Sequence, residues 1–271
     1  MDNDSLNGHR AEPLTAIVLD KPAIEAVALR KKYGDLEAVK GVNLRVATGE
    51  ILGFLGPNGA GKTTTIKMLT GLLQPTSGSA RICGYDIQTQ PIQAKARLGY
   101  VPDTPNLYGK LNGWEFLRFI ARLYRVPGEQ ADRRIQELLR LFELENAAGD
   151  LLEGYSHGMQ QKIALSAALI HDPQVLFLDE PTVGLDPRSA RRIKDILRQL
   201  AQRGTAVFFS THILEIAERM CNRVAIIAKG EIIALGTIAE LRARSGPGSL
   251  EDIFLALTGG AEYAEISEGV S

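Results

Sequence analysis

The feature that most constrains the fold is an apolar run at residues 51–55 that leads directly into a glycine-rich loop. The run has the length of a buried strand, and residues 62–72 have helical spacing. The loop between them, residues 56–63, reads Gly-Pro-Asn-Gly-Ala-Gly-Lys-Thr and fits the pattern GxxxxGK[ST]. Strand, loop and helix in this order is the context in which such a loop binds phosphate, so we expect an α/β nucleotide-binding fold.

The phosphate loop, residues 56–63, carries the first predicted site. Its glycines allow backbone N–H groups to surround phosphate oxygens at a helix N-terminus. Lys62 is expected to reach the β- and γ-phosphates, and the Thr63 hydroxyl to bind Mg²⁺. The residues predicted to contact the nucleotide in this segment are Gly56, Pro57, Asn58, Gly59, Ala60, Gly61, Lys62, Thr63 and Thr64.

A second motif follows the apolar run at residues 175–178, which ends in Asp179 and Glu180. Ligands in open α/β sheets bind where strands end, so these carboxylates are candidates for chemistry. Asp179 is predicted to hold Mg²⁺ directly or through water, and Glu180 to polarise an attacking water. Two acids at a strand end can also simply begin a loop, but the upstream phosphate loop favours the catalytic interpretation.

The rest of the chain alternates predicted strands and helices, which indicates an α/β fold. We predict a P-loop NTPase core with a mainly parallel sheet, an N-terminal antiparallel β subdomain and an inserted helical subdomain. The amphipathic pattern at residues 111–148 carries that insertion, which spans about residues 104–165. The expected boundaries are a flexible extension at 1–22, the nucleotide-binding domain at 23–240, and a linker, helix and tail at 241–271.

Composition narrows the classes of protein. The chain has 31 Lys and Arg against 32 Asp and Glu, so no net field favours nucleic acid as a partner. Cys83 and Cys221 are far apart and have no disulfide or zinc spacing. No stretch approaches the roughly 18 apolar residues of a spanning helix. We therefore expect a cytoplasmic chain that contacts a membrane only through a partner.

Residues 155–162, Tyr-Ser-His-Gly-Met-Gln-Gln-Lys, precede the Asp179 strand and resemble the signature segment of ABC-transporter ATP-binding subunits, usually LSGGQ. The order of motifs across residues 24–240 is similar to that of the family. The resemblance implies that MgATP is bound and hydrolysed by a dimer of ATP-binding subunits. Ser156 and Gly158 of one subunit would close over the ATP held by the other subunit's phosphate loop.

The resemblance implies roles for further residues. Tyr33 is similar to the aromatic residue that stacks on adenine, although an ordinary surface tyrosine is the alternative. Residues 184–186 resemble the D-loop, which couples the two sites across the dimer. His212 resembles the switch histidine that contacts the γ-phosphate, and completes a catalytic set with Lys62 and Glu180.

Three positions depart from the family pattern. Asp103 stands where the Q-loop usually has glutamine; it still offers oxygens to Mg²⁺ or water, but adds charge and loses the amide donor. In the signature, His157 replaces a glycine and Met159 replaces the glutamine. Contact with the nucleotide is expected to survive through Ser156 and the backbone, with altered detail.

The resemblance also implies a partner, an integral membrane permease. Its cytoplasmic helix is expected to dock at residues 107–119, with Tyr108, Trp114 and Phe116, unless these aromatic residues only fill the subdomain core. The signature, Asp103 and residues 250–254 together resemble subunits of the bacterial ABC-2 export type. The chain would then lie on the inner face of the cell membrane through its permease.

Two other classes remain as alternatives. A soluble ABC ATPase acting on ribosomes usually has two cassettes, and one acting on DNA has long coiled coils or a basic face. This chain has one cassette and a net charge of −1. A P-loop kinase or GTPase would have no use for Ser156, Gly158 and His212.

Overall fold

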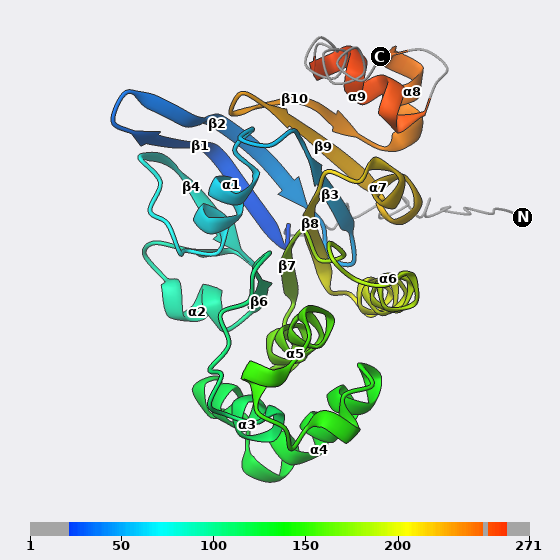
Figure 1. Ribbon diagram of the computed structural model, residues 1–271. Helices are drawn as coiled ribbons and strands as arrows, with labels where there is room; N and C mark the ends of the chain where they lie inside the picture. The colour runs from blue at the N-terminus through cyan, green and yellow to red at the C-terminus, as the bar shows by residue number, and fades with distance from the viewer. Residues whose placement is uncertain (1–21, 246–248, 259–271) are drawn as a thin grey trace, which may run out of the picture.

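The computed structural model describes residues 22–245 and 249–258, which form two sheets with helices around them (Figure 1). The first sheet has the order β2-β1-β4-β5, and every pairing in it is antiparallel. Its strands are β1 (Ile24–Tyr33), β2 (Leu36–Val46), β4 (Ser77–Ile82) and β5 (Tyr85–Asp86). This sheet is the predicted N-terminal antiparallel β subdomain.

The second sheet has the order β10-β9-β3-β8-β7-β6 and is parallel except for the β10–β9 pair. Its strands are β3 (Ile51–Leu55), β6 (Leu98–Val101), β7 (Val175–Asp179), β8 (Ala206–Thr211), β9 (Arg223–Ala228) and β10 (Glu231–Gly236). Every residue of β3, β7 and β8 is buried, as expected for strands covered on both faces. Since these strands run in parallel, their carboxyl ends share one edge of the sheet.

Helices cover both faces of the second sheet. The side chains of Phe177 and Phe208 face a core shared with α1 (Lys62–Leu69), α2 (Pro91–Lys95) and the first sheet. Leu176 and Val207, the neighbours that point the other way, face a core shared with α5 (His157–Leu169), α6 (Pro187–Gln202) and α7 (Leu214–Met220). Period-2 alternation thus divides the apolar side chains of β7 and β8 between two cores.

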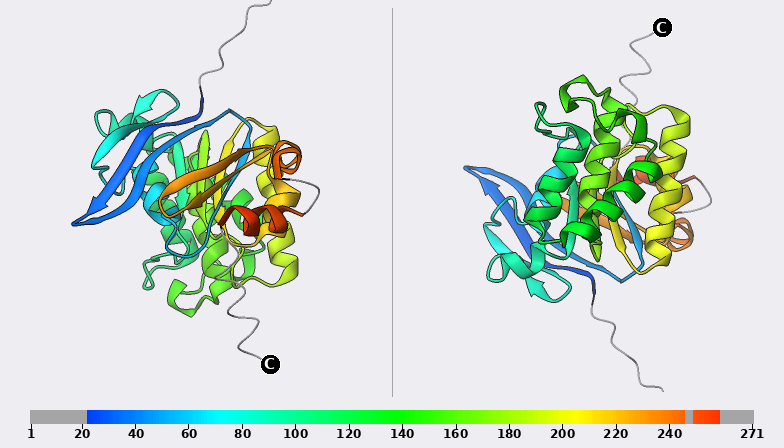
Figure 2. Two further views of the ribbon diagram at one scale, coloured as in Figure 1. Left: turned by 90° about the horizontal axis from the view of Figure 1, so that it is seen from above. Right: turned by 90° about the horizontal axis from the view of Figure 1, so that it is seen from below.

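The helical subdomain contains α3 (Gly113–Leu123) and α4 (Gly128–Leu141), at the opposite end of the molecule from α8 (Ile238–Ser245) and α9 (Leu250–Thr258) (Figures 1 and 2). A capping box fixes the start of α3, in which Asn112 and Glu115 each bond the other's backbone. Both helices pack on α5, which joins the subdomain to the sheet. There Gly99 of β6 lies so close to the Ala168 carbonyl of α5 that a Cβ would overlap it.

The predicted fold class is confirmed, and the differences lie towards the C-terminus. The sequence interpretation missed β10 and α8, which follow a tight turn in which Lys229 and Gly230 have φ of 49° and 85°. β10 is a half-buried edge strand with a short apolar run, and α8 follows it after one residue. The predicted boundary at residue 240 falls within α8. Of the predicted extension at residues 1–22, residues 1–21 lie outside the described residues, as do residues 259–271 of the predicted C-terminal segment.

None of the helices described, over residues 22–245 and 249–258, is both long enough and apolar enough to cross a membrane.

Substituting Phe208→Ala is expected to lower the free energy of unfolding by about 3–5 kcal/mol, because the ring is removed from a closely packed core. Phe208 is 0% exposed, with ring centroids 5.2 Å from Phe54 and 5.4 Å from Phe177. Denaturant unfolding measures the change. The control Ile92→Ala, at a side chain that is 80% exposed, should stay within about 0.5 kcal/mol of the parent. Equal losses for the two variants would contradict this packing.

Candidate functional site

The phosphate loop joins the end of β3 to the start of α1. Gly61, the N-cap of α1, has φ of 106° and offers no side chain to the first turn. A Cβ at Gly61 would also lie 2.7 Å from the Ala38 carbonyl, and one at Gly56 would overlap the Ile227 carbonyl. The first turn of α1 therefore keeps its N–H groups available for phosphate oxygens.

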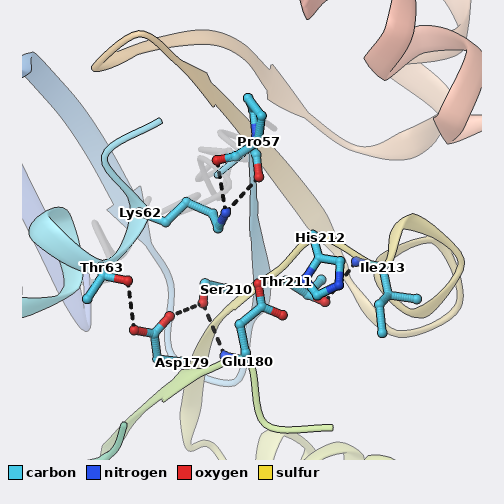
Figure 3. A network of polar contacts seen from close by, with 10 residues as sticks. Pro57, Lys62, Thr63, Asp179, Glu180, Ser210, Thr211, His212 and Ile213 are labelled. Atoms are coloured by element: carbon cyan, nitrogen blue, oxygen red, sulfur yellow. Dashed lines mark hydrogen bonds and ion pairs between the residues drawn. The ribbon is translucent and has the colours of Figure 1, made fainter. Parts of the chain in front are cut away.

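Lys62 is buried within this loop, and its ammonium donates to the carbonyls of Gly56 at 2.7 Å and Pro57 at 3.1 Å (Figure 3). Burial lowers the pKa of Lys62, while the charges of Glu180 and Asp179 act to raise it. A desolvated ammonium that is held by neutral carbonyls gains from any anion that reaches it. The arrangement suits a phosphate.

Asp179, at the end of β7, accepts hydrogen bonds on both carboxylate oxygens. The Thr63 hydroxyl donates to Oδ2 at 3.0 Å, and the Ser210 hydroxyl donates to Oδ1 (Figure 3). Ser210 Oγ in turn accepts from the backbone N–H of Glu180 at 3.2 Å. Thr63 and Asp179 thus present two hard oxygen ligands side by side, which fits Mg²⁺ bound by few protein groups and completed by phosphate and water.

Glu180 follows with φ of 48°, an unusual conformation for a residue with a side chain. Its Oε1 lies 3.0 Å from His212 Nδ1, whose side chain is half exposed. Its Oε2 is buried and has no hydrogen-bond partner in the described residues. A buried carboxylate oxygen without a partner is able to accept a hydrogen bond from an incoming water.

These groups surround a cavity of about 410 Å³. It is lined by Tyr33, Leu36, Ala38, Asn58, Gly59, Gly61, Lys62, Thr63, Thr64, Asp103, Asp179 and Glu180. Gly56, Pro57 and Ala60 do not line it, although the carbonyls of Gly56 and Pro57 accept from Lys62. His212 contacts the site through Glu180. The structure therefore brings together nearly all the residues predicted to contact one nucleotide.

Asp103 gives the cavity a further negative charge. Burial, with the charges of Asp179 and Asp103, raises the pKa of Tyr100 to about 12, so this phenol stays protonated. The residues that line the cavity thus include three carboxylates, Asp103, Asp179 and Glu180, and one ammonium, that of Lys62. An anionic ligand would therefore need an accompanying cation.

Tyr33 ends β1 at the mouth of the cavity and is 49% exposed. The Lys31 ammonium lies over its ring, 5.2 Å from the centroid, and donates to the Gln74 carbonyl at 2.8 Å. A cation on one side of the ring leaves the other side for a flat ligand. The adenine-stacking role of Tyr33 stays a prediction.

The two signature residues lie elsewhere. Ser156 caps α5, its hydroxyl accepting from the Met159 N–H at 3.4 Å, and is exposed. Neither Ser156 nor Gly158 lines the cavity. Their assignment to a nucleotide therefore depends on a second subunit.

Sequence reasoning missed Ser210 and Tyr100. The apolar run of this strand ends at residue 209, whereas β8 continues to Thr211 and so carries Ser210 beside Asp179. Only the pairing of β7 with β8 reveals this neighbour. Tyr100 alternates within β6, and no local pattern distinguishes it from other strand residues.

A profile of the family described as ABC transporter matches residues 39–183. The chain belongs to the ABC transporter family. The linearmycin resistance ATP-binding protein LnrL of Bacillus subtilis (strain 168) is 40% identical over 223 residues, covering 82% of this chain and 72% of that protein.

Two solved structures extend the match. An ATP-binding subunit of an ABC transporter has a TM-score of 0.83 and 34% identity, covering 87% of this chain and 99% of its own. A dimeric ATP-binding cassette in a post-hydrolysis state, bound to ADP and Pi, has a TM-score of 0.73 and 27% identity, covering 79% and 98%. The chain is thus an ATPase domain of the ABC family.

Substituting Ser210→Ala is expected to destabilise the fold by about 1–3 kcal/mol, because a buried oxygen of Asp179 loses its donor. It should also raise the Mg²⁺ concentration that half-saturates ATP turnover, since Asp179 is no longer oriented. The two readouts are denaturant unfolding and a Mg²⁺ titration of ATPase rate. Ser77→Ala, at an exposed serine of β4, serves as the control. An unchanged Mg²⁺ requirement would contradict the orienting role of Ser210.

Proposed function

We propose that the chain binds MgATP in this cavity, hydrolyses it as a dimer, and so drives export through a separate integral membrane permease at the inner face of the cell membrane. One observation carries the proposal. The cavity collects the phosphate loop, Asp179 and Glu180, yet Ser156 and Gly158 lie outside it. A cavity that collects the reacting groups but not the signature of its own subunit is half of a composite site.

The case for Mg²⁺ comes from charge. Three carboxylates and one ammonium give the cavity a negative balance, and the ATP phosphates would add to it. A divalent cation between Asp179 and the phosphates offsets both, and Thr63 supplies a neutral oxygen beside it. When bound, Mg²⁺ would supply charge neutralisation at the β- and γ-phosphates. Asp103, which also lines the cavity, would contribute an oxygen directly or through water.

Hydrolysis follows from the groups that surround the phosphate end of the cavity. Lys62 is close enough to exchange its carbonyl partners for phosphate oxygens. The partnerless Oε2 of Glu180 would orient a water for attack on the γ-phosphate, while Oε1 stays on His212. His212 is half exposed and able to turn from Glu180 to the γ-phosphate when ATP arrives.

The dimer supplies the missing half of each site. Ser156 and the N-terminus of α5 are exposed, so the hydroxyl and the helix dipole are available to a γ-phosphate held by the second subunit. The dimeric cassette bound to ADP and Pi supports this arrangement by similarity.

The permease surface is proposed on the helical subdomain. Tyr108 is 58% exposed, with its ring centroid 5.4 Å from that of Phe119 and 6.3 Å from that of Phe116. Phe116 is buried, so this aromatic fills the subdomain core and does not line a groove. Trp114 is half-buried and so contacts both the core and the surface. Exposed Tyr108 and Phe119 thus form the apolar contact that a permease helix would cover.

Export is the finer part of the proposal. It rests on the ABC-2 resemblance of the signature and of Asp103, and on the resistance named for the relative LnrL. A soluble ABC ATPase that acts on ribosomes or DNA is the second candidate. The near-zero net charge speaks against a nucleic-acid partner.

Substituting Glu180→Gln is expected to preserve ATP binding and lower turnover by about 10²- to 10⁴-fold, because the general base is lost while the shape is kept. ATP should then stabilise a closed dimer, detected by size-exclusion chromatography with light scattering. The control is Glu153→Gln, at an exposed carboxylate of the helical subdomain. Hydrolysis by Glu180→Gln at the parent rate would show that Glu180 is not the base.

Mild detergent extraction of cells expressing the tagged chain is expected to recover a polytopic membrane protein. Tyr108→Ala should weaken that association several-fold and leave the ATPase rate of the isolated chain unchanged, since Tyr108 lies outside the nucleotide cavity. The control is Leu123→Ala, because Leu123 is another apolar residue of the subdomain and is 62% exposed. Recovery of ribosomes in place of a membrane protein would favour the second candidate.

A further inference from the structure

His157, where the family usually has glycine, contacts the D-loop of its own subunit. Its Nε2 lies 3.3 Å from the carbonyl oxygen of Val183, which immediately precedes the D-loop, residues 184–186. A carbonyl only accepts, so Nε2 is the donor and carries a proton. The contact joins residues 26 positions apart in the chain.

The ring of His157 also lies against Gly184. A Cβ on Gly184 would come within 2.8 Å of His157 Cδ2, and Gly184 has φ of 72°. Both the backbone conformation and the adjacent ring therefore require glycine at this position. The next residues of the two segments are also close to each other. A Cβ placed on Gly158 would lie 3.5 Å from Leu185 Cδ2, which is ordinary van der Waals distance. Consecutive signature residues thus meet consecutive D-loop residues.

The ends of the D-loop segment are already fixed by other interactions. Its N-terminal end follows Glu180, whose carbonyl accepts from the Val183 N–H at 3.2 Å. Its C-terminal end is Asp186, which caps α6 by accepting from the Ser189 N–H at 2.9 Å. Between these ends, the Leu185 N–H donates to the Thr182 carbonyl at 3.4 Å, and the only side-chain donor to residues 183–185 among the described residues is His157, on the Val183 carbonyl. Removing His157 would therefore take away the side-chain contacts of Val183 and Gly184 and leave these backbone hydrogen bonds in place.

We propose that His157 is a positioning residue that holds the D-loop against the signature, so that each subunit presents both segments to its partner as one preformed surface. This inference rests on the proposed composite site. His157 and Gly184 are both exposed, so the joined surface is open to a second subunit. Holding the segment in advance lowers the conformational entropy that must be lost when the dimer closes.

Amide hydrogen exchange on the full-length chain without nucleotide tests the contact directly. His157→Gly should raise exchange at residues 183–186 about three- to tenfold, the range that corresponds to one net hydrogen bond. His157→Gln keeps a donor and should recover part of the protection. The matched control is Gln160→Gly, which introduces glycine into the same first turn of α5 without removing His157. Equal exchange of residues 183–186 in the two glycine variants would overturn the proposal.

The consequence for the dimer is measured in the Glu180→Gln background with saturating ATP. Adding His157→Gly should shift the dimerisation midpoint to several-fold higher protein concentration, while binding of a fluorescent ATP analogue to the chain's own phosphate loop stays unchanged. Loosened exchange with an unshifted midpoint would overturn the link to the partner. If Glu180→Gln alone forms no ATP-dependent dimer, the proposed function fails, and the exchange experiment still decides whether His157 holds the D-loop.

Discussion

The arrangement of the nucleotide site depends on the parallel register between β7 and β8. That register sets Asp179 opposite Ser210 and Phe177 opposite Phe208. The apolar residues of these strands pack into a core on each face of the sheet. A register slip of one residue would therefore turn each side chain towards the wrong core. The same register brings the Ser210 hydroxyl to the Asp179 carboxylate, and the Thr63 hydroxyl binds that carboxylate from α1. The register between β7 and β8 therefore determines both the packing of the core and the geometry of the site.

Local motifs explain why much of the site could be predicted from the sequence. The phosphate loop, the carboxylates after β7 and the helix beginning at Ser156 are each contiguous, and each uses a backbone arrangement that short patterns encode. The apolar run at residues 51–55, predicted to be a buried strand, is β3 to the residue. Parallel strands then brought the phosphate loop and the two carboxylates to one edge of the sheet, and Ser156 lies away from them.

Contacts between distant segments could not be predicted. Ser210 meets Asp179 across 31 positions and His157 meets Val183 across 26, and neither contact leaves a periodic trace in the sequence. The helical subdomain shows the same limit. Amphipathic spacing predicted an apolar face, but only the fold distinguishes buried Phe116 from exposed Tyr108.

The cavity and the signature divide the chemistry of the ABC site unevenly. Every titratable group assigned to the phosphates lies on the cavity side, whereas the signature offers a hydroxyl and a helix N-terminus. Neutral donors suit that position, because a charged group there would repel or attract the second subunit whether or not ATP were present. Closure of the proposed dimer would then depend on the nucleotide.

The backbone contact between Gly99 and Ala168 has a mechanical meaning. No side chain separates β6 from α5 at this point, so the two backbones are in direct contact. We expect a load applied to α3 and α4 to move α5 and β6 together, with little rearrangement at this contact. This contact would connect the proposed permease surface on the helical subdomain to the sheet that carries the proposed ATP-binding residues.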